Sequence, residues 1–415
     1  MAQTRAIILA AGKGTRLKSD IPKVLHKVCG RPVVSYIVNL VSSLKTYVVV
    51  GYGASVVKDV IGSDVQYCLQ DQLLGTGDAV RRVETSLKGF TGNLIVLCGD
   101  TPLLEKSIVA KVMATHQKSN ASATILSARV SNPHGYGRMM RNNKGEVIGI
   151  KEQKDLQLGE EKNNEINVGV YGFKAKDLFD ALRGIKLNAK KKEYYLTDVI
   201  SILIARGKKI SSVVSDDPNV AFGINTRQDV AQAEGIMRAR ILDKLMTSGV
   251  SIIDPATTYV DSGAKIGQDT ILYPCTVIEG DVIIGKHCKI GPFARIRPGS
   301  RISDNTEIGN FTEVSRTTIG KKVMMKHFSF LGDTTVGDGT NIGAGVVTAN
   351  YDGRNKNKTL IGKNAFIGSD AILIAPVTIG QKATVGAGSV VRRGTKVKAN
   401  SVVVGVPART IKGNK

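Results

Sequence analysis

The chain has 415 residues, 42% of them hydrophobic and 22% charged, which excludes a disordered protein and fits one with a sizeable core. No apolar run reaches the roughly 18–20 residues of a membrane helix, and the N-terminus lacks the layout of a secretory signal, so we expect a cytoplasmic protein without membrane insertion. The net charge of +23 is spread over both halves of the chain, which fits a solvated surface or phosphorylated ligands better than nucleic-acid binding.

Residues 1–225 alternate short apolar runs with helical stretches, for example 77–87. The continuous apolar runs fit strands that are covered on both faces, and they are AlaIleIleLeuAla (6–10), TyrValValValGly (47–51) and LeuIleValLeuCysGlyAsp (94–100). Strands that alternate with helices predict a parallel α/β sheet. Asp100 ends the last of these segments, where it could cap a helix or contact a ligand at the carboxyl edge of the sheet.

The first predicted strand leads directly into a glycine-rich loop, LeuAlaAlaGlyLysGlyThrArg at 9–16. Small residues let backbone N–H groups approach a phosphate or a base closely, and Lys13 and Arg16 add positive charge. The spacing matches neither GxxxxGK[ST] nor GxGxxG, so it does not support a kinase or a dehydrogenase. The five cysteines form no CxxC pair and no Cys/His cluster, so we expect neither a zinc site nor a disulfide framework.

A linker helix is predicted over residues 226–249. Apolar residues recur there at helical spacing, namely Val230, Ala233, Met237, Ile241 and Leu245. Thr226 is placed to cap the helix, and Gly249 with the Asp254–Pro255 turn is placed to end it.

Residue usage changes after residue 250, where 36 Ile and Val accompany only 4 Leu. Pairs of Ile or Val followed by Gly recur at near-multiples of six, which indicates hexapeptide repeats and predicts a β-helix with about 18 residues in each triangular coil. A Gly-rich β-sandwich, the alternative, would space its strands by 8–12 residues. The segment 344–360 interrupts the repeat, and we expect a functional loop there.

Ordered motifs along the whole chain resemble the bacterial bifunctional UDP-N-acetylglucosamine pyrophosphorylase and glucosamine-1-phosphate N-acetyltransferase family. The motifs are AlaAlaGlyLysGlyThrArgLeu (10–17), AspIleProLysValLeuHis (20–26), GlyThrGlyAsp (75–78), GlyAspThrProLeu (99–103), GlyTyrGlyArg (135–138), TyrTyrLeuThrAsp (194–198), GlyIleAsn (223–225), ArgIleArgProGly (295–299), LysHisPheSerPheLeuGlyAsp (326–333) and AsnTyrAspGlyArgAsnLys (350–356). The resemblance implies a Rossmann-like α/β nucleotidyltransferase domain at 1–225 and an all-β, left-handed parallel β-helix of hexapeptide repeats at 250–415.

The resemblance also implies roles for residues of the first half. Those for the uridylyl reaction are a uridine-phosphate loop at Leu9, Ala10, Ala11 and Gly12, uracil contacts at Gln70, Gly75 and Thr76, charge neutralisation by Arg16 and Lys23, Mg²⁺ ligands at Asp100 and Asn225, and N-acetylglucosamine contacts at Gly137, Glu152 and Asn167. Hard oxygen ligands, completed by waters and substrate phosphates, are what Mg²⁺ prefers.

In the second half, the resemblance places an acetyltransferase site between the subunits of a homotrimer. His327 would be the general base, because an imidazole of near-neutral pKa can take a proton from an attacking amine. The other implied contacts are Arg297, Asn341 and Lys356 for the sugar phosphate, Asn350 and Tyr351 for support of the base or the amine, and Ala344, Ser369 and Ala387 for acetyl-CoA.

The expected activity is bifunctional. Glucosamine-1-phosphate would be acetylated by acetyl-CoA, and the product would react with UTP to give UDP-N-acetylglucosamine, a precursor of peptidoglycan and lipopolysaccharide, and pyrophosphate. The chain departs from the family at Leu73, Asp78 and Cys98 in the first half and at Ser315, Phe330 and Gly405 in the second. A uridylyltransferase whose β-helix only holds a trimer together therefore stays open, as does a non-catalytic relative of the exchange-factor type, against which the intact glycine loop argues.

Overall fold

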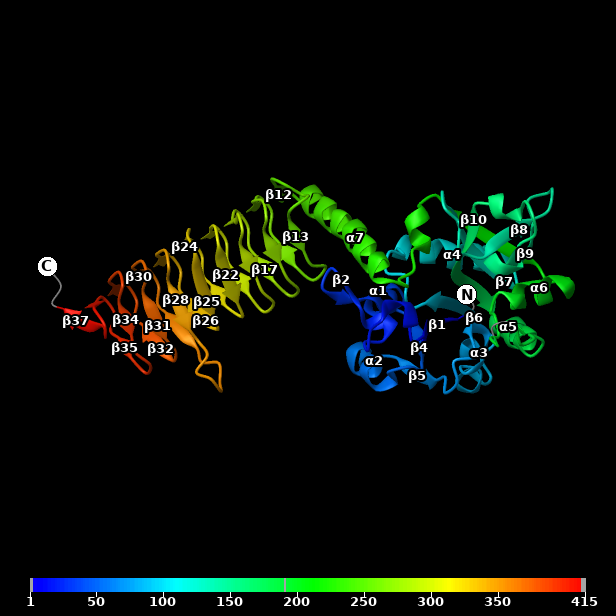
Figure 1. Ribbon diagram of the computed structural model, residues 1–415, viewed down its shortest axis with the longest axis horizontal. Helices are drawn as coiled ribbons and strands as arrows, with labels where there is room; N and C mark the ends of the chain where they lie inside the picture. The colour runs from blue at the N-terminus through cyan, green and yellow to red at the C-terminus, as the bar shows by residue number, and fades with distance from the viewer. Residues whose placement is uncertain (1–2, 190–191, 412–415) are drawn as a thin grey trace. The chain divides into compact units, whose positions relative to one another are not determined.

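The computed structural model describes residues 3–189 and 192–411, and it divides the chain into two units, Met1–Glu234 and Gly235–Lys415. The first unit is built on a mixed β-sheet with the strand order β11-β7-β10-β6-β1-β4-β5, and β8 and β9 extend it from β10 (Figure 1). The strands are β1 Thr4–Ala10, β4 Lys45–Val50, β5 Gln66–Leu69, β6 Asn93–Cys98, β7 Ala123–Arg129, β8 Arg138–Arg141, β9 Val147–Lys151, β10 Glu165–Lys174 and β11 Ile210–Ser215.

Helices and a short hairpin complete the first unit. They are the β2–β3 hairpin (Lys27–Val28 and Arg31–Pro32), α1 Val33–Leu40, α2 Ala54–Ile61, α3 Thr76–Arg81, α4 Lys106–Ser119, α5 Ala175–Leu182 and α6 Asp198–Ala205. The helix predicted over 77–87 is shorter than expected, because α3 ends at Arg81 and only a single 3₁₀ turn, Thr85–Leu87, follows it. No helix among the described residues is long and apolar enough to cross a membrane.

The expectation of a wholly parallel sheet is wrong at β10. Strands β4, β1 and β6 pair in parallel, as do β7 and β11, but β10 runs antiparallel to both β6 and β7. Parallel pairing needs a crossover connection, usually an α-helix, and between β7 and β10 the chain forms the antiparallel β8–β9 hairpin instead. The apolar run of β10 carries no sign of this direction, so its sequence could not show it.

Helix α7, Arg227–Thr247, occupies the predicted linker and begins with a reciprocal cap. The Asp229 N–H donates to the Thr226 hydroxyl oxygen (3.1 Å), and the Asp229 carboxylate accepts the Thr226 N–H (2.8 Å). The helix is followed by Gly249 at φ 91°, a conformation that favours glycine. The cap at Thr226 is therefore confirmed, and α7 begins in the first unit and ends in the second.

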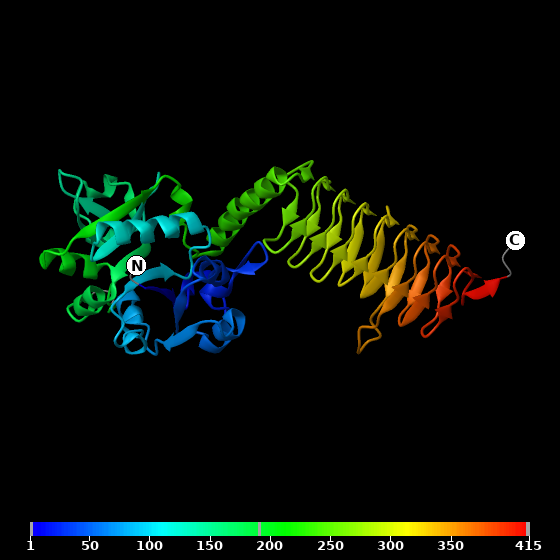
Figure 2. The same ribbon diagram turned by 180° about the vertical axis from the view of Figure 1, so that it is seen from behind.

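The second unit is a parallel β-helix with three faces (Figure 1 and Figure 2). The first face holds β12 Ser251–Ile252, β15 Ile271–Leu272, β18 Lys289–Ile290, β21 Glu307–Ile308, β24 Met324–Met325, β27 Asn341–Ile342, β30 Phe366–Ile367, β33 Thr384–Val385, β36 Val402–Val404 and the antiparallel β37 Arg409–Ile411. The second holds β13 Tyr259–Val260, β16 Val277–Ile278, β19 Arg295–Ile296, β22 Thr312–Ser315, β25 Ser329–Gly332, β28 Val347–Ala349, β31 Ile372–Ile374 and β34 Val390–Val391. The third holds β14 Lys265–Ile266, β17 Ile283–Ile284, β20 Arg301–Ile302, β23 Thr318–Ile319, β26 Thr334–Val336, β29 Thr359–Ile361, β32 Val377–Ile379 and β35 Lys396–Val397.

The predicted coil of about 18 residues is confirmed by the strand register. Ile278 pairs with Ile296 and Ile296 with Val314, each 18 residues further on, and all three side chains are buried. In most strands one aliphatic side chain thus points to the axis of the β-helix and its neighbour faces outward, while the inward residue of β28 is Thr348. This stacked aliphatic core explains why Ile and Val replace Leu after residue 250.

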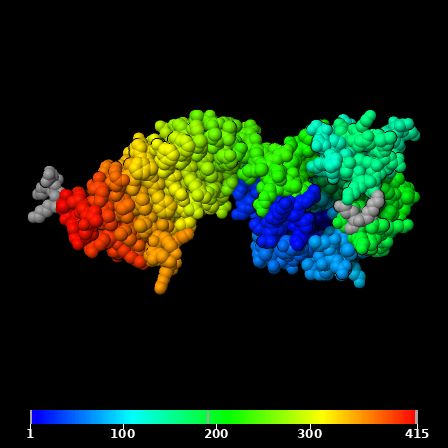
Figure 3. Space-filling model, in the orientation of Figure 1, coloured from blue at the N-terminus to red at the C-terminus, as the bar shows by residue number. Residues whose placement is uncertain are grey.

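One coil of the β-helix is longer than the rest. Asn341 pairs with Phe366, 25 residues later, and the extra residues form a loop in which Tyr351 bridges back to Lys356. In Figure 3 this loop is the orange segment that projects from the surface. The interruption is narrower than the predicted 344–360, because β28 keeps the regular register before the loop begins.

We predict that protonation of His116 destabilises the first unit at low pH. His116 is buried beneath the sheet with its Nδ1 3.0 Å from the Thr124 hydroxyl, and burial lowers its pKa to about 4. The unfolded chain binds a proton near pH 6.5 and the folded chain does not, so stability falls as the pH drops from 6.5 to 4, by about 3 kcal/mol in total. Calorimetric unfolding of the full chain at pH 7 and pH 4 should show this loss, and the loss should be smaller in His116→Gln. An equal loss in His116→Gln would contradict the prediction, and His134→Gln, at an exposed position, serves as the control.

Candidate active sites

A pocket of about 420 Å³ opens at the carboxyl ends of β1 and β6. Eight of the predicted residues line it, namely Leu9, Ala11, Gly12, Lys23, Gln70, Gly75, Thr76 and Asp100. Ala10 does not, because alternate residues of a strand face opposite sides and the Ala10 side chain packs into the core. The pocket therefore lies at the edge of the sheet where α/β folds bind ligands.

The glycine loop closes tightly over the segment that carries Lys23. Gly14 has φ 69°, and a Cβ on it would lie 2.6 Å from the Cβ of Lys23. Any larger residue would therefore push the two segments apart. Around Gly12, in contrast, a Cβ would meet no atom within 4 Å, so the backbone of the loop faces open space in the pocket. A loop with this exposure can present its N–H groups to a phosphate.

The ammonium group of Lys23 bridges the two predicted metal ligands. Its Nζ pairs with the Asp100 carboxylate and donates to Asn225 Oδ1 (2.8 Å). Arg16 donates to the same Asn225 oxygen (2.8 Å), although it does not line the pocket. The two predicted metal ligands and the two predicted cationic side chains therefore form one cluster. Within it, the Lys23 ammonium alone contacts an oxygen of each ligand.

Backbone contacts hold Asn225 in this position. The Ile224 N–H donates to the Asp100 carbonyl oxygen (2.9 Å), which ties the segment before α7 to the end of β6. The Asn225 N–H donates to the Asp229 carboxylate (2.8 Å), and the Asn225 amide nitrogen donates to the Gly223 carbonyl oxygen (3.3 Å). Because the amide nitrogen is used there, the amide oxygen faces Lys23 and Asp100.

The cluster suits Mg²⁺ better than a transition metal. No group of three or more His, Cys, Asp or Glu side chains within the described ranges could hold a metal ion. One carboxylate and one amide oxygen, already gathered around a cation, are the partial ligand set that Mg²⁺ shares with waters and phosphates. The residues present therefore fit a magnesium ion that arrives with a phosphorylated ligand.

A second group of predicted residues forms a neighbouring cluster. The Asn167 N–H donates to the Gly137 carbonyl oxygen (2.9 Å), and a Cβ on Gly137 would lie 3.6 Å from both carboxylate oxygens of Glu152. Thr197 donates its hydroxyl to Glu152 (3.0 Å) and orients the carboxylate. The three predicted sugar contacts are thus brought together.

Cys98 lies between this cluster and the pocket. It lines the pocket, and its Sγ is 3.5 Å from the Gly169 carbonyl oxygen, in the strand that also carries Asn167. Burial raises the pKa of Cys98 to about 12, and the negative charge of Asp100 adds to the effect. Cys98 is therefore an uncharged thiol between the two clusters, and we do not expect it to act as a nucleophile.

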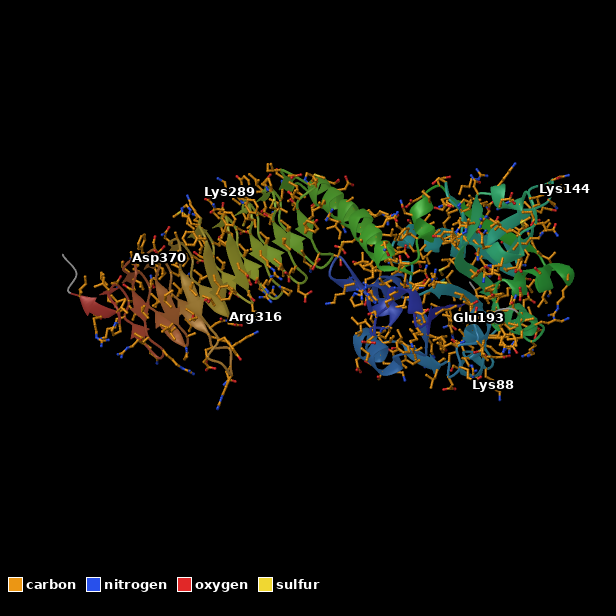
Figure 4. The ribbon with its side chains drawn as sticks, in the orientation of Figure 1. Lys88, Lys144, Glu193, Lys289, Arg316 and Asp370 are labelled. Atoms are coloured by element: carbon orange, nitrogen blue, oxygen red, sulfur yellow. The ribbon has the colours of Figure 1, made fainter. Side chains whose placement is uncertain are left out.

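Pocket residues of the segment after α5 have no role in the sequence-based prediction. Glu193, labelled in Figure 4, and Tyr195 line the pocket, and the Tyr194 N–H donates to the Leu74 carbonyl oxygen (2.7 Å). The motif that contains them carries the family resemblance, but it has no spacing that indicates a particular chemistry. Only the fold places this segment over the pocket.

On the β-helix, one corner gathers charged and polar groups beside the projecting loop. Arg316, labelled in Figure 4, donates to both carboxylate oxygens of Asp333 (2.7 and 2.8 Å) and to the Ser315 hydroxyl (2.9 Å). Asn350 also donates to Asp333, and Lys356 adds its positive charge. The hydrogen bonds from Arg316 above all hold the pKa of Asp333 below its usual range.

His327 lies at the other end of β25, on a column of predicted acetyl-CoA contacts. The Gly345 N–H donates to the Phe328 carbonyl oxygen, the Asp370 N–H to that of Ala344, and the Gly388 N–H to that of Ser369. These bonds stack His327, Ala344, Ser369 and Ala387 at one corner of four successive coils. The column and His327 are therefore stacked along one corner of the β-helix.

The two corners of the β-helix do not form one site within a single chain. His327 and Asp333 are separated by the extended strand β25, which places them roughly 15–20 Å apart. Arg297 pairs with Glu313 (2.9 Å), Asn341 lies on the first face, and the Tyr351 hydroxyl donates to the Gly353 carbonyl oxygen (2.7 Å) within the loop. In one chain, the predicted residues of the second half therefore lie in separate groups.

Comparison with known proteins agrees with this two-part architecture. Residues 5–235 match the nucleotidyl transferase family, residues 263–298 and 281–316 match the bacterial transferase hexapeptide repeat, and residues 358–393 match the hexapeptide repeat of succinyl-transferase. The chain is 43% identical to the bifunctional protein GlmU of Shouchella clausii, over 96% of this chain and 95% of that protein. It is 44% identical to the GlmU proteins of Pelotomaculum thermopropionicum (90% of this chain, 89% of that protein) and Geobacillus thermodenitrificans (94% and 93%).

The chain belongs to the GlmU family. It is therefore a bifunctional transferase, with a nucleotidyltransferase part and a hexapeptide-repeat acyltransferase part. The second part is the left-handed β-helix that this kind of repeat forms. The GlmU relatives match the chain across both units, so the two parts belong together as one enzyme.

We predict that Cys98 resists alkylation. A pKa of about 12 lowers its thiolate fraction at pH 8 by roughly 1,000-fold relative to an ordinary thiol of pKa 9, and iodoacetamide reacts with the thiolate. Timed alkylation of the folded protein, followed by peptide mass spectrometry, should leave Cys98 unmodified after Cys275 has reacted, although both cysteines are half-buried. Equal rates at the two cysteines would show that Cys98 is more acidic and more open than its surroundings imply.

Proposed function

We propose that this GlmU enzyme makes UDP-N-acetylglucosamine in two steps at two separate sites, with residues 1–225 as the uridylyltransferase domain, 226–249 as a linker and 250–415 as the acetyltransferase domain. The observation that carries the proposal is the cluster of Lys23, Arg16, Asp100 and Asn225 at the edge of a nucleotide-sized pocket. Two cations and two metal-ligating oxygens at one place suit the transfer of a nucleotidyl group between phosphates. All substrates of both steps are cytoplasmic metabolites, so we place the enzyme in the cytoplasm.

In the uridylyl step, the phosphate oxygen of N-acetylglucosamine-1-phosphate attacks the α-phosphorus of UTP. The new P–O bond forms as the bond to the bridging oxygen breaks, and pyrophosphate leaves. Because no covalent intermediate with the enzyme is needed, positioning and charge stabilisation supply most of the catalysis. Lys23 and Arg16 stabilise the charge on the departing pyrophosphate, the glycine loop binds the nucleotide phosphates, and the cluster of Gly137, Glu152 and Asn167 orients the sugar.

Asp100 and Asn225 would hold the Mg²⁺ ion of this step. Bound there, the ion supplies neutralisation of the phosphate oxygens. Lys23 now occupies the space between the two ligands, and it is the group that must release them when the ion binds. Its ammonium is then free to contact the substrate phosphates.

In the acetyl step, the amine of glucosamine-1-phosphate attacks the thioester carbonyl of acetyl-CoA. His327 accepts a proton from the amine as the C–N bond forms, the C–S bond breaks, and the proton passes to the sulfur, so coenzyme A leaves as its thiol. The column of Ala344, Ser369 and Ala387 leaves room for the coenzyme beside the backbone. Arg297, Asn341 and Lys356 bind the sugar phosphate, and Asn350 and Tyr351 support the reacting groups.

The separation of the two corners of β25 supports a homotrimer. His327 with its column lies at one corner, and Asn350 and Lys356 lie with the projecting loop at the other. A neighbouring copy of the chain can bring its loop to the His327 corner and complete the site. We therefore propose that each acetyltransferase site is built from more than one chain.

Single substitutions should separate the two reactions. Asp100→Ala should lower pyrophosphate release from UTP and N-acetylglucosamine-1-phosphate by at least 100-fold and leave coenzyme A release from acetyl-CoA and glucosamine-1-phosphate unchanged. His327→Ala should do the reverse, because loss of a general base costs about 10²–10⁴-fold in rate.

Removal of Mg²⁺ with a chelator should abolish pyrophosphate release in the native enzyme. If either variant lost both activities, the division into two sites would be wrong. If the native enzyme released no coenzyme A, the β-helix would be a scaffold only.

Mixing two inactive variants tests the shared site. His327→Ala and Asn350→Ala should each lack acetyl transfer as pure proteins, while mixed trimers formed by co-expression should recover part of it. Recovery is expected because some sites then combine an intact His327 from one chain with an intact Asn350 from another. Co-expression of His327→Ala with itself under two tags is the control. Absence of recovery in isolated mixed trimers would place the whole site in one chain.

A further inference from the structure

We infer that Asp78 is a positioning residue that fixes the side-chain amide of Gln70 and so selects uracil over cytosine, an inference that rests on the proposed uridylyltransferase function. Gln70 follows β5 at the pocket wall and is 96% buried, with 4% of its surface exposed. Its amide nitrogen donates to the Asp78 carboxylate (2.9 Å) and to the Gly75 carbonyl oxygen (3.0 Å). Both amide N–H groups of Gln70 are therefore used within the protein.

The orientation of the Gln70 amide follows from what Asp78 can do. An ionised carboxylate only accepts hydrogen bonds, so the nitrogen of the Gln70 amide must face Asp78 and the oxygen must face away from it. Within the described ranges, the hydrogen bonds of the Gln70 side chain are the two that its amide nitrogen donates, and none reaches the oxygen, Oε1. Because Gln70 lines the pocket, its wall presents a hydrogen-bond acceptor that a ligand in the pocket can reach.

Gly75 supplies a donor next to this acceptor. Its carbonyl oxygen is bound to the Gln70 amide, and its N–H has no acceptor within residues 3–189 and 192–411. An N–H beside an acceptor oxygen complements the adjacent O4 and N3–H of uracil. Cytosine presents the opposite pair, an amino group and an unprotonated N3. The Gly75 N–H would then face the amino group, another donor, and the Gln70 oxygen would face N3, another acceptor. The fixed orientation of the Gln70 amide is therefore what lets these two groups distinguish uracil from cytosine.

Arg82 forms an ion pair with the buried carboxylate of Asp78. Its Nε lies 3.3 Å from the same carboxylate oxygen, and its side chain reaches toward the surface. The nearly fully buried Asp78 side chain thus has a cationic partner. Arg82 does not line the pocket, so it offers a matched control that removes one contact of the Asp78 carboxylate and leaves the carboxylate in place to accept from Gln70.

The test compares UTP with CTP in the full-length enzyme. Pyrophosphate release with N-acetylglucosamine-1-phosphate gives kcat/KM for each nucleotide, and calorimetric titration with each nucleotide alone gives its Kd. Asp78→Asn and Asp78→Ala should lower the UTP/CTP ratio of kcat/KM by about tenfold or more, because the Gln70 amide can then turn over. The ratio of the two Kd values should shift in the same direction.

The controls separate positioning from simple loss of structure. A variant that is only destabilised loses activity with both nucleotides equally, so its UTP/CTP ratio stays at the native value. Arg82→Gln should keep the ratio within about twofold. An unchanged ratio in both Asp78 variants would overturn the inference, whereas a native enzyme that releases no pyrophosphate from UTP would overturn the proposed function itself.

Discussion

The ammonium group of Lys23 organises the first active site. It binds the Asp100 carboxylate at the end of β6 and the Asn225 amide oxygen just before α7, two positions far apart in the sequence. Without a cation between them, a carboxylate and a carbonyl dipole that face each other would repel. The hydrogen bond from Ile224 to the Asp100 carbonyl oxygen sets their spacing, and the ammonium neutralises the charge. The glycine loop, the pocket and the start of α7 are all arranged around this contact.

The β-helix solves a different problem with a simpler rule. Most strands contribute one inward aliphatic side chain, and the next coil covers it, so the core grows by repetition. Because each coil depends mainly on its two neighbours, a coil with a projecting loop is tolerated as long as the strand register resumes. The register does resume, since Phe366 pairs with Asn341 on one side and Thr384 on the other. The loop thus adds polar groups at no cost to the core.

Much of this architecture could be predicted from the sequence, and the reasons differ between the halves. The hexapeptide spacing predicts the coils because the repeat length is set by one local geometry. Thr226 as a cap is predictable because the capping box is local too. The direction of β10 is not predictable in this way, since an apolar run looks the same in either orientation. The grouping of Gly137 with Glu152 and the pairing of Arg316 with Asp333 depend on chain segments that only the fold brings together.

The same contrast holds for side chains inside the pocket. Gln70 is recognisable from its motif, but the orientation of its amide depends on its hydrogen bond to Asp78. Glu193 and Tyr195 reach the pocket from a segment that has no chemical signature of its own. Local patterns therefore identify which residues are present, and tertiary packing decides which of their atoms a ligand meets.

The stacked corner that carries His327, Ala344, Ser369 and Ala387 places these residues at regular intervals. Neighbouring coils of the β-helix are about 4.8 Å apart, so these four positions extend over three coil spacings, about 14 Å in total. A slender, extended molecule laid along the corner would be measured in whole coils, and deleting one coil would displace its far end by a full step while leaving every remaining contact chemically intact.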